Sequence, residues 1–304
     1  MEFIPYNKEP TKVIETPSGD IASFISGEEA NIDKVTVNSF GAEWSKFNSF
    51  TSEEINQVGN DYFDIVDFKY LNPKSTRALD VGCGSGRWSL YIADKVLSID
   101  CIDPSDAVLI AQQNLSKKAN ARVTKASAED MPFSDDSFDF VFSLGVLHHI
   151  PDTEEALKNC VSKLKRGGYL LIYLYYNLDN RGRIFRWILK IVSSVRYLIA
   201  RLPKVFKELS CDIIAFTVYL PLIGISKMLA WLFPKRAIYQ KVPLSYYIDK
   251  SLNVIRNDAL DRFGTPLEQR FSKNEIQKML ENAGITNIKF SNIEPYWHAI
   301  GQKE

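Results

Sequence analysis

The sequence predicts an α/β fold in which a mostly parallel sheet is covered by helices on both faces. The first observation is that two short apolar runs, 78–81 and 96–102, flank a glycine turn and a helical pattern. Strand, glycine turn, helix and second strand in this order form the first half of a nucleotide-binding βαβ unit. The second observation is that later apolar runs alternate with helical patterns, as in a parallel sheet. These runs are 123–125, 138–144 and 169–176.

Three closely spaced glycines, Gly82, Gly84 and Gly86, form the turn of this unit. Glycine lets the backbone turn sharply and lets a ligand lie against it without a Cβ in the way. The next helix presents its free N–H groups and the positive end of its dipole to that ligand. Dinucleotide folds use G-x-G-x-x-G under a pyrophosphate. Here G-x-G-x-G is followed by Arg87 and Trp88, a bulky pair that leaves less room for a diphosphate.

Two acidic residues indicate the chemistry of the ligand. Asp103 stands at the end of the second apolar run, where a carboxylate can accept hydrogen bonds from both hydroxyls of a ribose. Asp80, two residues before the first glycine, would repel phosphate but suits an ammonium or a sulfonium. A ligand with an adenosine, an amino acid and a positive sulfur therefore fits these residues better than a dinucleotide does.

Four segments resemble successive motifs of the class I S-adenosylmethionine (SAM)-dependent methyltransferases. They read ALDVGCGSGRWS, CIDPS, SAEDMPFSDDSFDFVFSLGVLHHIPD and LKRGGYLLI, in order over residues 78–173. The chain resembles the type 11-like members, in a bacterial subset with a helical insert. The resemblance implies SAM as the cofactor. It also implies a Rossmann-like doubly wound sheet of seven strands, mostly parallel with one antiparallel strand, under a helical cap.

The resemblance also assigns cofactor residues. In the family, the turn after the third strand flanks the adenine ring, which points to Ala128 and Glu129 here. Leu144 ends the fourth strand and should face the methionine part of SAM or the acceptor, because ligands bind at that edge of an open α/β sheet. The expected cofactor residues are Asp80, Gly82, Gly84, Gly86, Asp103, Ala128, Glu129 and Leu144.

Two adjacent histidines, His148 and His149, follow the fourth strand. A histidine with a near-neutral pKa can take a proton from a hydroxyl, so either is a candidate general base. The alternative is a structural role, since this pair recurs in family members with unrelated acceptors. The third histidine, His298, lies in a predicted last strand, and no metal site is expected from histidines so distributed.

Residues 1–70 are expected to form an N-terminal arm and a helix. Loops and a small hairpin are expected over 1–35. In the aromatic segment that follows, the rings either pack onto the main domain or place Phe40 or Trp44 over the cofactor. Similar F-G-x-x-W segments precede the SAM domain in related bacterial sequences. A helix over about 52–71 then begins with acidic residues that suit its dipole.

Residues 177–266 form an insert that leaves from the carboxyl end of the fifth strand, and we expect it to cap the active site. Residues 181–208 hold eight basic residues and one acid along a helical apolar stripe. Such a helix can lie on an anionic membrane, or can be an ordinary cap helix. The stretch 213–226 is short and contains Pro221 and Gly224, so a buried hairpin or an apolar tunnel is expected rather than a spanning helix.

The acceptor-binding residues are expected to be Trp44, Tyr176, Arg262 and Arg270. The two arginines belong to a polar run that ends the insert and could return over the cleft. Alternatively its charges pair with one another. The expected domains are 1–70 (arm and helix), 71–176 (SAM-binding core), 177–266 (helical cap) and 267–304 (return to the core).

Composition narrows the range of partners. Lys+Arg and Asp+Glu both number 37, so no net charge suggests nucleic acid. The four cysteines show no metal spacing and indicate a reducing compartment. No signal peptide is apparent, so we expect a cytoplasmic protein, with peripheral contact to the inner face of the membrane through 181–233 as an alternative. The oligomeric state is not predicted.

The expected function is methyl transfer from SAM to an O, N or S nucleophile of a small or lipid-like acceptor. One alternative is a membrane-surface methyltransferase that modifies a lipid or a lipid-linked sugar. Another is a non-catalytic binding protein on the same fold. The intact glycine loop and ribose acid disfavour that reading, because such proteins usually lose one or the other.

Overall fold

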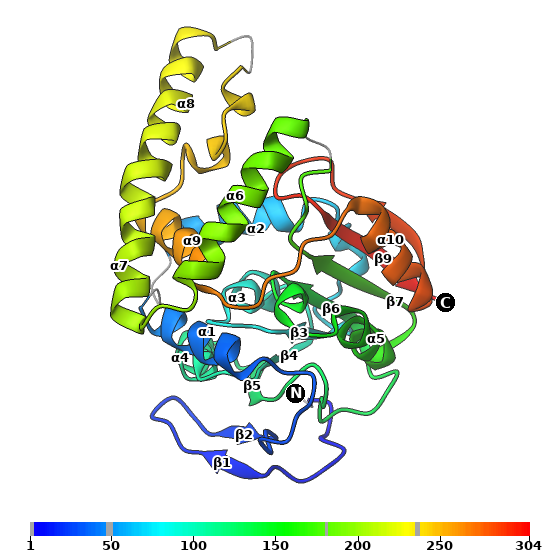
Figure 1. The fold of residues 1–304 in the computed structure, drawn as a ribbon. Coiled ribbons are helices and arrows are strands. Elements are labelled where there is room, and N and C mark those ends of the chain that lie inside the picture. Colours follow the sequence, from blue (N-terminus) through cyan, green and yellow to red (C-terminus); the bar gives the residue numbers. More distant parts are fainter. Residues whose placement is uncertain (1–2, 47–50, 180–181, 235–237) are drawn as a thin grey trace. The chain divides into compact units, whose positions relative to one another are not determined.

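The computed structural model describes residues 3–46, 51–179, 182–234 and 238–304. Contacts within the chain divide it into unit 1, residues 1–182 with 267–304, and unit 2, residues 183–266. Unit 1 holds the α/β core and unit 2 holds the helices of the insert (Figure 1). Each unit is described by itself.

Unit 1 is built on one sheet. Its strands are β1 (Lys12–Ile14), β2 (Ile21–Ser23), β3 (Arg77–Val81), β4 (Ser98–Asp103), β5 (Ala121–Lys125), β6 (Phe138–Leu144), β7 (Leu164–Tyr173), β8 (Ile285–Phe290) and β9 (His298–Lys303). Among the described residues they follow the order β1-β2-β5-β4-β3-β6-β7-β9-β8. Strand β9 is antiparallel to both of its neighbours. The seven expected strands are present, and the N-terminal hairpin β1–β2 extends the sheet beside β5.

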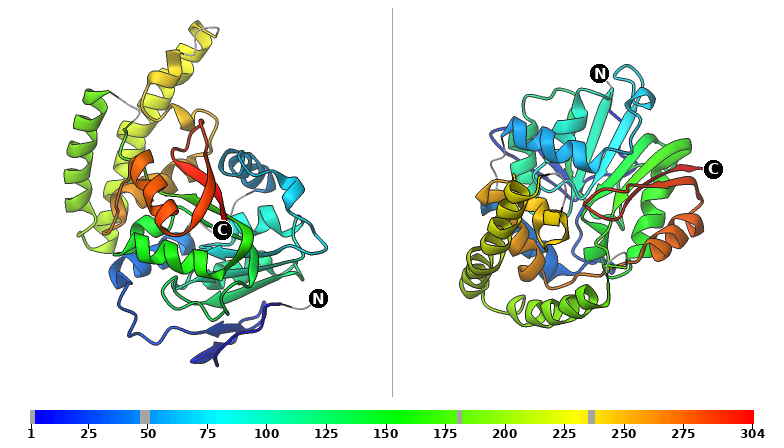
Figure 2. Two further views of the ribbon diagram at one scale, coloured as in Figure 1. Left: turned by 90° about the vertical axis from the view of Figure 1, so that its right-hand side faces the viewer. Right: turned by 90° about the horizontal axis from the view of Figure 1, so that it is seen from above.

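Helices cover both faces of this sheet because successive side chains of a strand point to opposite sides. Leu79 and Val81 face the core that includes α5 (Thr153–Lys163) and α10 (Lys273–Asn282). Ala78 faces the core that includes α3 (Arg87–Ala93) and α4 (Ala107–Leu115). The two views of Figure 2 show α10 and the blue-cyan helices on opposite sides. Unit 1 also contains α1 (Lys34–Lys46), α2 (Ser52–Tyr62) and 3-10 turns at Phe68–Tyr70 and Leu147–His149.

Two boundaries differ from the sequence expectation. Helix α2 ends at Tyr62 and not near residue 71, because Phe63 and Ile65 turn into the core. The helical pattern over 152–164, followed by Gly167 and Gly168, predicts a helix that stops at these glycines, but α5 ends at Lys163 and both glycines lie within β7. A Cβ on Gly168 would lie 2.9 Å from the Asp139 carbonyl oxygen, so glycine permits the close approach of β6 and β7 there.

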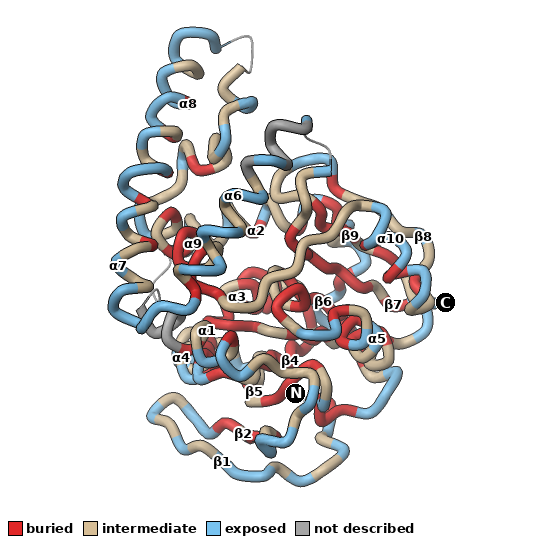
Figure 3. The backbone as a smooth tube through the Cα atoms, viewed as in Figure 1, coloured by how far each residue is buried: buried red, intermediate tan, exposed pale blue. Residues whose placement is uncertain are grey.

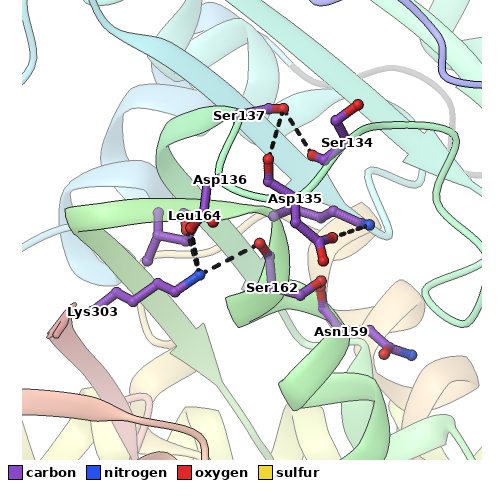
Figure 4. Close-up of polar contacts among 9 residues, drawn as sticks. Ser134, Asp135, Asp136, Ser137, Asn159, Ser162, Leu164 and Lys303 are labelled. Atoms are coloured by element: carbon purple, nitrogen blue, oxygen red, sulfur yellow. Dashed lines mark hydrogen bonds and ion pairs between the residues drawn. The ribbon is translucent and has the colours of Figure 1, made fainter.

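Lys303, the last residue of β9, ties the end of the chain to the start of β6 (Figure 4). Its ammonium donates to the Asp136 carboxylate at 2.8 Å and to the Leu164 carbonyl at 2.7 Å. The neighbouring Lys163 pairs with Asp135 at 2.6 Å. These contacts fix the sheet at the edge opposite to the carboxyl ends of β3, β4 and β6, which remain for the site.

Unit 2 is helical over its described residues. Its elements are α6 (Arg183–Ile199), α7 (Lys204–Ile214), a π turn (Ala215–Tyr219), α8 (Leu220–Leu232), 3-10 turns (Ile238–Lys241 and Ser245–Tyr247) and α9 (Leu252–Gly264). Helix α7, the π turn and α8 run on as one helix of 29 residues, Lys204–Leu232. The inner face of α7 and the π turn packs on α9, that of α8 packs on the two 3-10 turns, and Figure 3 shows much of the remainder exposed.

The expected hairpin at 213–226 is therefore wrong: this stretch is the middle of a continuous helix. Pro221 lacks an N–H and its ring crowds the preceding turn, which normally breaks or kinks a helix. Here a wider π turn comes just before it, at Ala215–Tyr219, and the helix continues. By length and composition alone, Lys204–Leu232 could cross a membrane.

Candidate active site

The glycine turn lies between the carboxyl ends of β3 and β4. Gly82, Gly84 and Gly86 have φ angles of 80°, 53° and 78°, a region that favours glycine. A Cβ on Gly82 would lie 2.3 Å from Cγ1 of Val146, so a side chain here would collide with the loop after β6. The turn is held by the N–H groups of Gly82 and Cys83, which donate to the Ile102 carbonyl at the end of β4.

Asp80 lies in β3 directly under this turn, with its side chain fully buried. The hydroxyl of Ser89, from α3, donates to its Oδ2 at 2.6 Å. Its Oδ1 has no hydrogen-bond partner among the residues that the structure describes. Burial raises the pKa of Asp80 from 3.8 to about 7, aided by the nearby Asp103 and opposed by Ser89 and Arg87. A buried acceptor without a donor is a place where a cationic ligand group could bind.

Asp103 ends β4 and links the glycine turn to the segment that follows β4. Its Oδ2 accepts the N–H of Gly84 at 3.0 Å, and its Oδ1 accepts the N–H and hydroxyl of Ser105 at 2.8 and 2.6 Å. Burial raises the pKa of Asp103, while the bonds from Ser105 and Gly84 oppose that shift. Each carboxylate oxygen can accept a further hydrogen bond, so these contacts orient the group and leave capacity for ribose hydroxyls.

The expected adenine residues follow β5. Ala128 is buried. The carboxylate of Glu129 accepts the N–H groups of Ala30 and Asn31, at 3.3 and 2.8 Å, and thus ties the N-terminal segment to this turn. An interaction of adenine with this turn is therefore better assigned to its backbone than to the Glu129 carboxylate. The two residues remain predicted adenine contacts.

Both candidate histidines lie in the 3-10 turn that follows Leu144, the buried last residue of β6. His148 is fully buried, and neither ring nitrogen has a hydrogen-bond partner among the described residues. Burial, followed by the charges of His149 and Arg270, lowers the pKa of His148 well below 6.5. His149 instead donates from Nδ1 to the Leu267 carbonyl at 2.6 Å. In the neutral ring this leaves Nε2 as the acceptor nitrogen.

Arg270 lies close enough to His148 for its charge to lower the pKa of that histidine. Its Nε donates to Glu268 at 2.7 Å, and its guanidinium lies 5.5 Å from the ring of Tyr175. Tyr175 in turn stacks on His148 with ring centroids 4.0 Å apart. Sequence reasoning missed Tyr175 and Glu268. The tyrosine-rich end of β7 and the E-Q-R triplet were the available signals.

Two other acceptor candidates have partners within their own units. Tyr176 forms a bridge with Phe271 and packs edge-on against Tyr296, centroids 5.6 Å apart. Arg262 belongs to unit 2, where it pairs with Asp258 at 2.8 Å. This pairing matches the alternative that charges in this run bind one another.

Helix α1 reaches two parts of the site. Phe40 meets the ring of His149 edge-on, centroids 4.9 Å apart. A Cβ on Gly41 would lie 3.4 Å from the backbone nitrogen of Asp106, just beyond Asp103. This segment thus contacts residues that follow the carboxyl ends of β4 and β6, and a role as a cover over the cofactor remains a prediction. The side chain of Trp44, and residues 47–50, lie outside the described part of the chain.

These residues fit SAM. The acceptor oxygen of Asp80 suits an ammonium, Asp103 suits a ribose, and the glycine turn lets a ligand approach the backbone. No group of three His, Cys, Asp or Glu suited to a metal occurs among the described residues.

Comparison with known proteins agrees with this site. Residues 79–172 match the model of a methyltransferase domain. The ubiquinone biosynthesis O-methyltransferase of Coxiella burnetii is 26% identical over 186 residues, 58% of this chain and 74% of that protein. The phosphoethanolamine N-methyltransferase 2 of Caenorhabditis elegans is 37% identical over 101 residues, 32% of this chain and 23% of that one.

Among solved structures, a proposed methyltransferase of Bacillus halodurans aligns over 74% of this chain and 72% of its own, at 17% identity and a TM-score of 0.45. The matched domain contains the glycine turn, both acids and the strands that position them. The chain thus contains a class I S-adenosylmethionine-dependent methyltransferase domain over residues 79–172.

Proposed function

We propose that the enzyme methylates a lipid-like acceptor, and that a hydroxyl of that acceptor is the nucleophile. The observation that carries this proposal is a continuous aromatic wall at the carboxyl ends of β6 and β7, with little charge. The aromatic wall comprises Phe40, Tyr62, Trp88, His148, His149, Tyr173 and Tyr175. Its rings pass from α1 to the start of α3, beside the glycine turn, and the pair Arg270–Glu268 borders it.

The wall favours an acceptor with an apolar or ring-shaped body, since aromatic side chains bind such surfaces well. Two of the relatives point the same way. One is named for ubiquinone biosynthesis, and another, the demethylmenaquinone methyltransferase of Staphylococcus aureus, is named for a menaquinone precursor. Others are named for phosphoethanolamine and for a tRNA uridine, so the relatives alone do not select the acceptor.

SAM, when bound, supplies a methyl carbon activated by its positive sulfur. The chain's main task is alignment, since holding reactants in near-attack geometry accounts for several kcal/mol of the barrier. For a hydroxyl acceptor we assign His149 as the base, because the Leu267 carbonyl fixes its Nδ1–H and so directs the proton to Nε2. His148, whose pKa is lowered, stays neutral and supports Tyr175. An amine or thiolate acceptor would need no base.

The test is transfer of label from methyl-tritiated SAM into three separate pools: bacterial total lipid, water-soluble metabolites and tRNA. We expect label in the organic phase. An Asp103→Ala variant, deprived of the ribose contact, is the negative control. Label confined to the water-soluble pool or to tRNA would contradict a lipid-like acceptor.

With a responsive lipid in hand, His149→Gln tests the base. We expect kcat to fall by about 10²–10⁴ with SAM affinity unchanged, because the variant loses only proton transfer. His148→Gln should leave the pH profile of kcat in place. A His149→Gln variant with near-normal kcat would show that the nucleophile needs no base.

A further inference from the structure

We propose that helix Lys204–Leu232 lies flat in the surface of an anionic membrane, with its outer apolar face inserted into one leaflet. The inference deepens the proposed function, because it brings the enzyme to the phase that holds a lipid-like acceptor. It depends only on the side chains of unit 2, so its test can fail or succeed independently of the chemistry.

The helix has one covered face and one bare face. Cys211, Ala215, Tyr219 and Ile223 recur at steps of four and are buried. Steps of four drift by about 40° around an α-helix, and the wider π turn in this stretch offsets part of that drift. The remaining face exposes large apolar side chains along the whole helix: Val205, Phe206, Leu209, Ile213, Phe216, Val218, Ile225, Met228, Trp231 and Leu232.

The charges on this helix favour insertion. Between residues 209 and 226 the sequence has a single charged residue, Asp212. Its carboxylate forms a two-point ion pair with Arg256 of α9, both N···O distances being 2.8 Å. The acid is thus directed to the covered face, and the bare face carries no formal charge over these turns.

The ends of the helix and the preceding α6 carry the features of a membrane interface. Among the side chains that the structure describes here, the exposed basic residues are Lys190, Arg201, Lys204 and Lys227, and cations near an anionic surface strengthen binding. Aromatic residues that favour the interface are also exposed: Trp187 at 65%, Tyr197 at 56% and Trp231 at 81%. An anionic lipid surface therefore complements both the apolar face and its basic borders.

The contacts of the covered face argue against a spanning orientation. At the level of residues 212 and 219, near the middle of the helix, the packed partner α9 contributes Arg256, Asp258 and Arg262. A helix that crossed the bilayer would carry these charges into the hydrocarbon, which is costly. Lying in the plane keeps them on the aqueous side and buries only the apolar face.

Binding is tested with the full chain and two kinds of vesicle, one of phosphatidylcholine alone and one with about a quarter phosphatidylglycerol. We expect co-sedimentation with the anionic vesicles at about 0.05 M salt and weaker binding at about 0.5 M. Phe206→Ser with Phe216→Ser should lower the partition coefficient at least tenfold, since burial of each ring contributes roughly that factor. Val13→Ser, a comparably exposed apolar residue in unit 1, is the matched control and should change nothing.

Orientation is tested with fluorophores on cysteines placed at Phe206, Phe216 and Met228, quenched by lipids spin-labelled at different depths. An in-plane helix gives similar shallow depths at all three positions. A deep central probe between two shallow ones would show a spanning helix and overturn the proposal.

Two other results would also overturn it. One is no binding at low salt. The other is a lipid-free dimer that the serine pair converts to a monomer, which would make the bare face an interface between copies. SAM affinity, measured by calorimetry in every variant, verifies the fold of unit 1. Vesicle binding without label transfer to lipid would refute the proposed acceptor and leave this inference intact.

Discussion

Asp80 provides a direct test of the electrostatics of the cofactor site. Its pKa is raised from 3.8 to about 7, mainly by burial. Below pH 7 the free enzyme therefore holds this group protonated and neutral. A bound ammonium favours the carboxylate, so binding of SAM should release a proton. Between pH 7 and the lower pKa of the complex, affinity should fall by up to about tenfold for each pH unit of acidification.

The release is best measured at pH 6, where the α-ammonium of SAM, with an ordinary pKa of about 8, is still protonated. About 0.9 of the Asp80 carboxyls carry a proton there, if the pKa is about 7. Calorimetric titrations in buffers of different ionisation enthalpy should then report close to 0.9 proton released per SAM, and Asp80→Asn should report close to none from this site. Equal release from both proteins would refute the assignment of Asp80.

The same shift predicts how stability depends on pH without ligand. A folded pKa above the unfolded one means that the folded state binds more protons between pH 4 and 7. The associated stability is complete below pH 4 and is lost as pH rises to 7, at about 1.4 kcal/mol per unit and on the order of 4 kcal/mol in all. Urea unfolding of the wild type should show this loss, and Asp80→Asn should show a flatter profile. If stability changed with pH equally in both proteins, the raised pKa would not belong to Asp80.

Three further changes test the surrounding structure. Asp103→Ala should weaken SAM binding at least about tenfold in calorimetry, because it removes charged hydrogen bonds worth about 1.5–3 kcal/mol each, and unchanged affinity would disprove the ribose assignment. Gly82→Ala should lower the free energy of unfolding, measured in urea, by about 2–4 kcal/mol. Gly27→Ala, with φ of 89° but open space around it, should lower it by only about 1–2 kcal/mol. Equal losses in the two variants would contradict a steric role for Gly82. Arg256→Met should lower the free energy of unfolding by about 1–3 kcal/mol, and adding Asp212→Asn should recover part of that loss. Strictly additive losses would show that Arg256 and Asp212 are not coupled.

The sequence predicted elements whose signals are local. The strand, glycine turn and helix around Gly82 follow from a few adjacent residues. The helix Lys204–Leu232 was missed because Pro221 and Gly224 were treated as breakers. A π turn that accommodates a proline cannot be recognised from residue types alone.

The cofactor and acceptor ends of the site also differ in how far apart their residues lie in the sequence, and so in how well they could be predicted. Asp80 and Asp103 stand within about two dozen residues of each other in one βαβ unit, so their roles could be predicted. Tyr175 and Arg270 meet only because residues 267–271 bind back to the end of β7, with the Phe271 N–H on the Tyr175 carbonyl at 2.8 Å. An insert of more than eighty residues separates the two segments, and a single sequence does not specify which distant segments pair.

The two buried acids also explain why this loop selects a sulfonium nucleoside over a dinucleotide. Asp80 and Asp103 both have raised pKa values, and the charge of Asp103 adds to the shift at Asp80. A diphosphate would add negative charge beside two buried acids that already disfavour negative charge. The nearby Arg87 stacks its guanidinium on the Trp88 ring, 4.4 Å from the ring centroid. A cationic ligand instead offsets the cost of ionising both acids. Above pH 7, where the free enzyme holds Asp80 ionised, part of the affinity for SAM arises from relief of that cost, and replacing Asp103 should weaken the pH dependence contributed by Asp80.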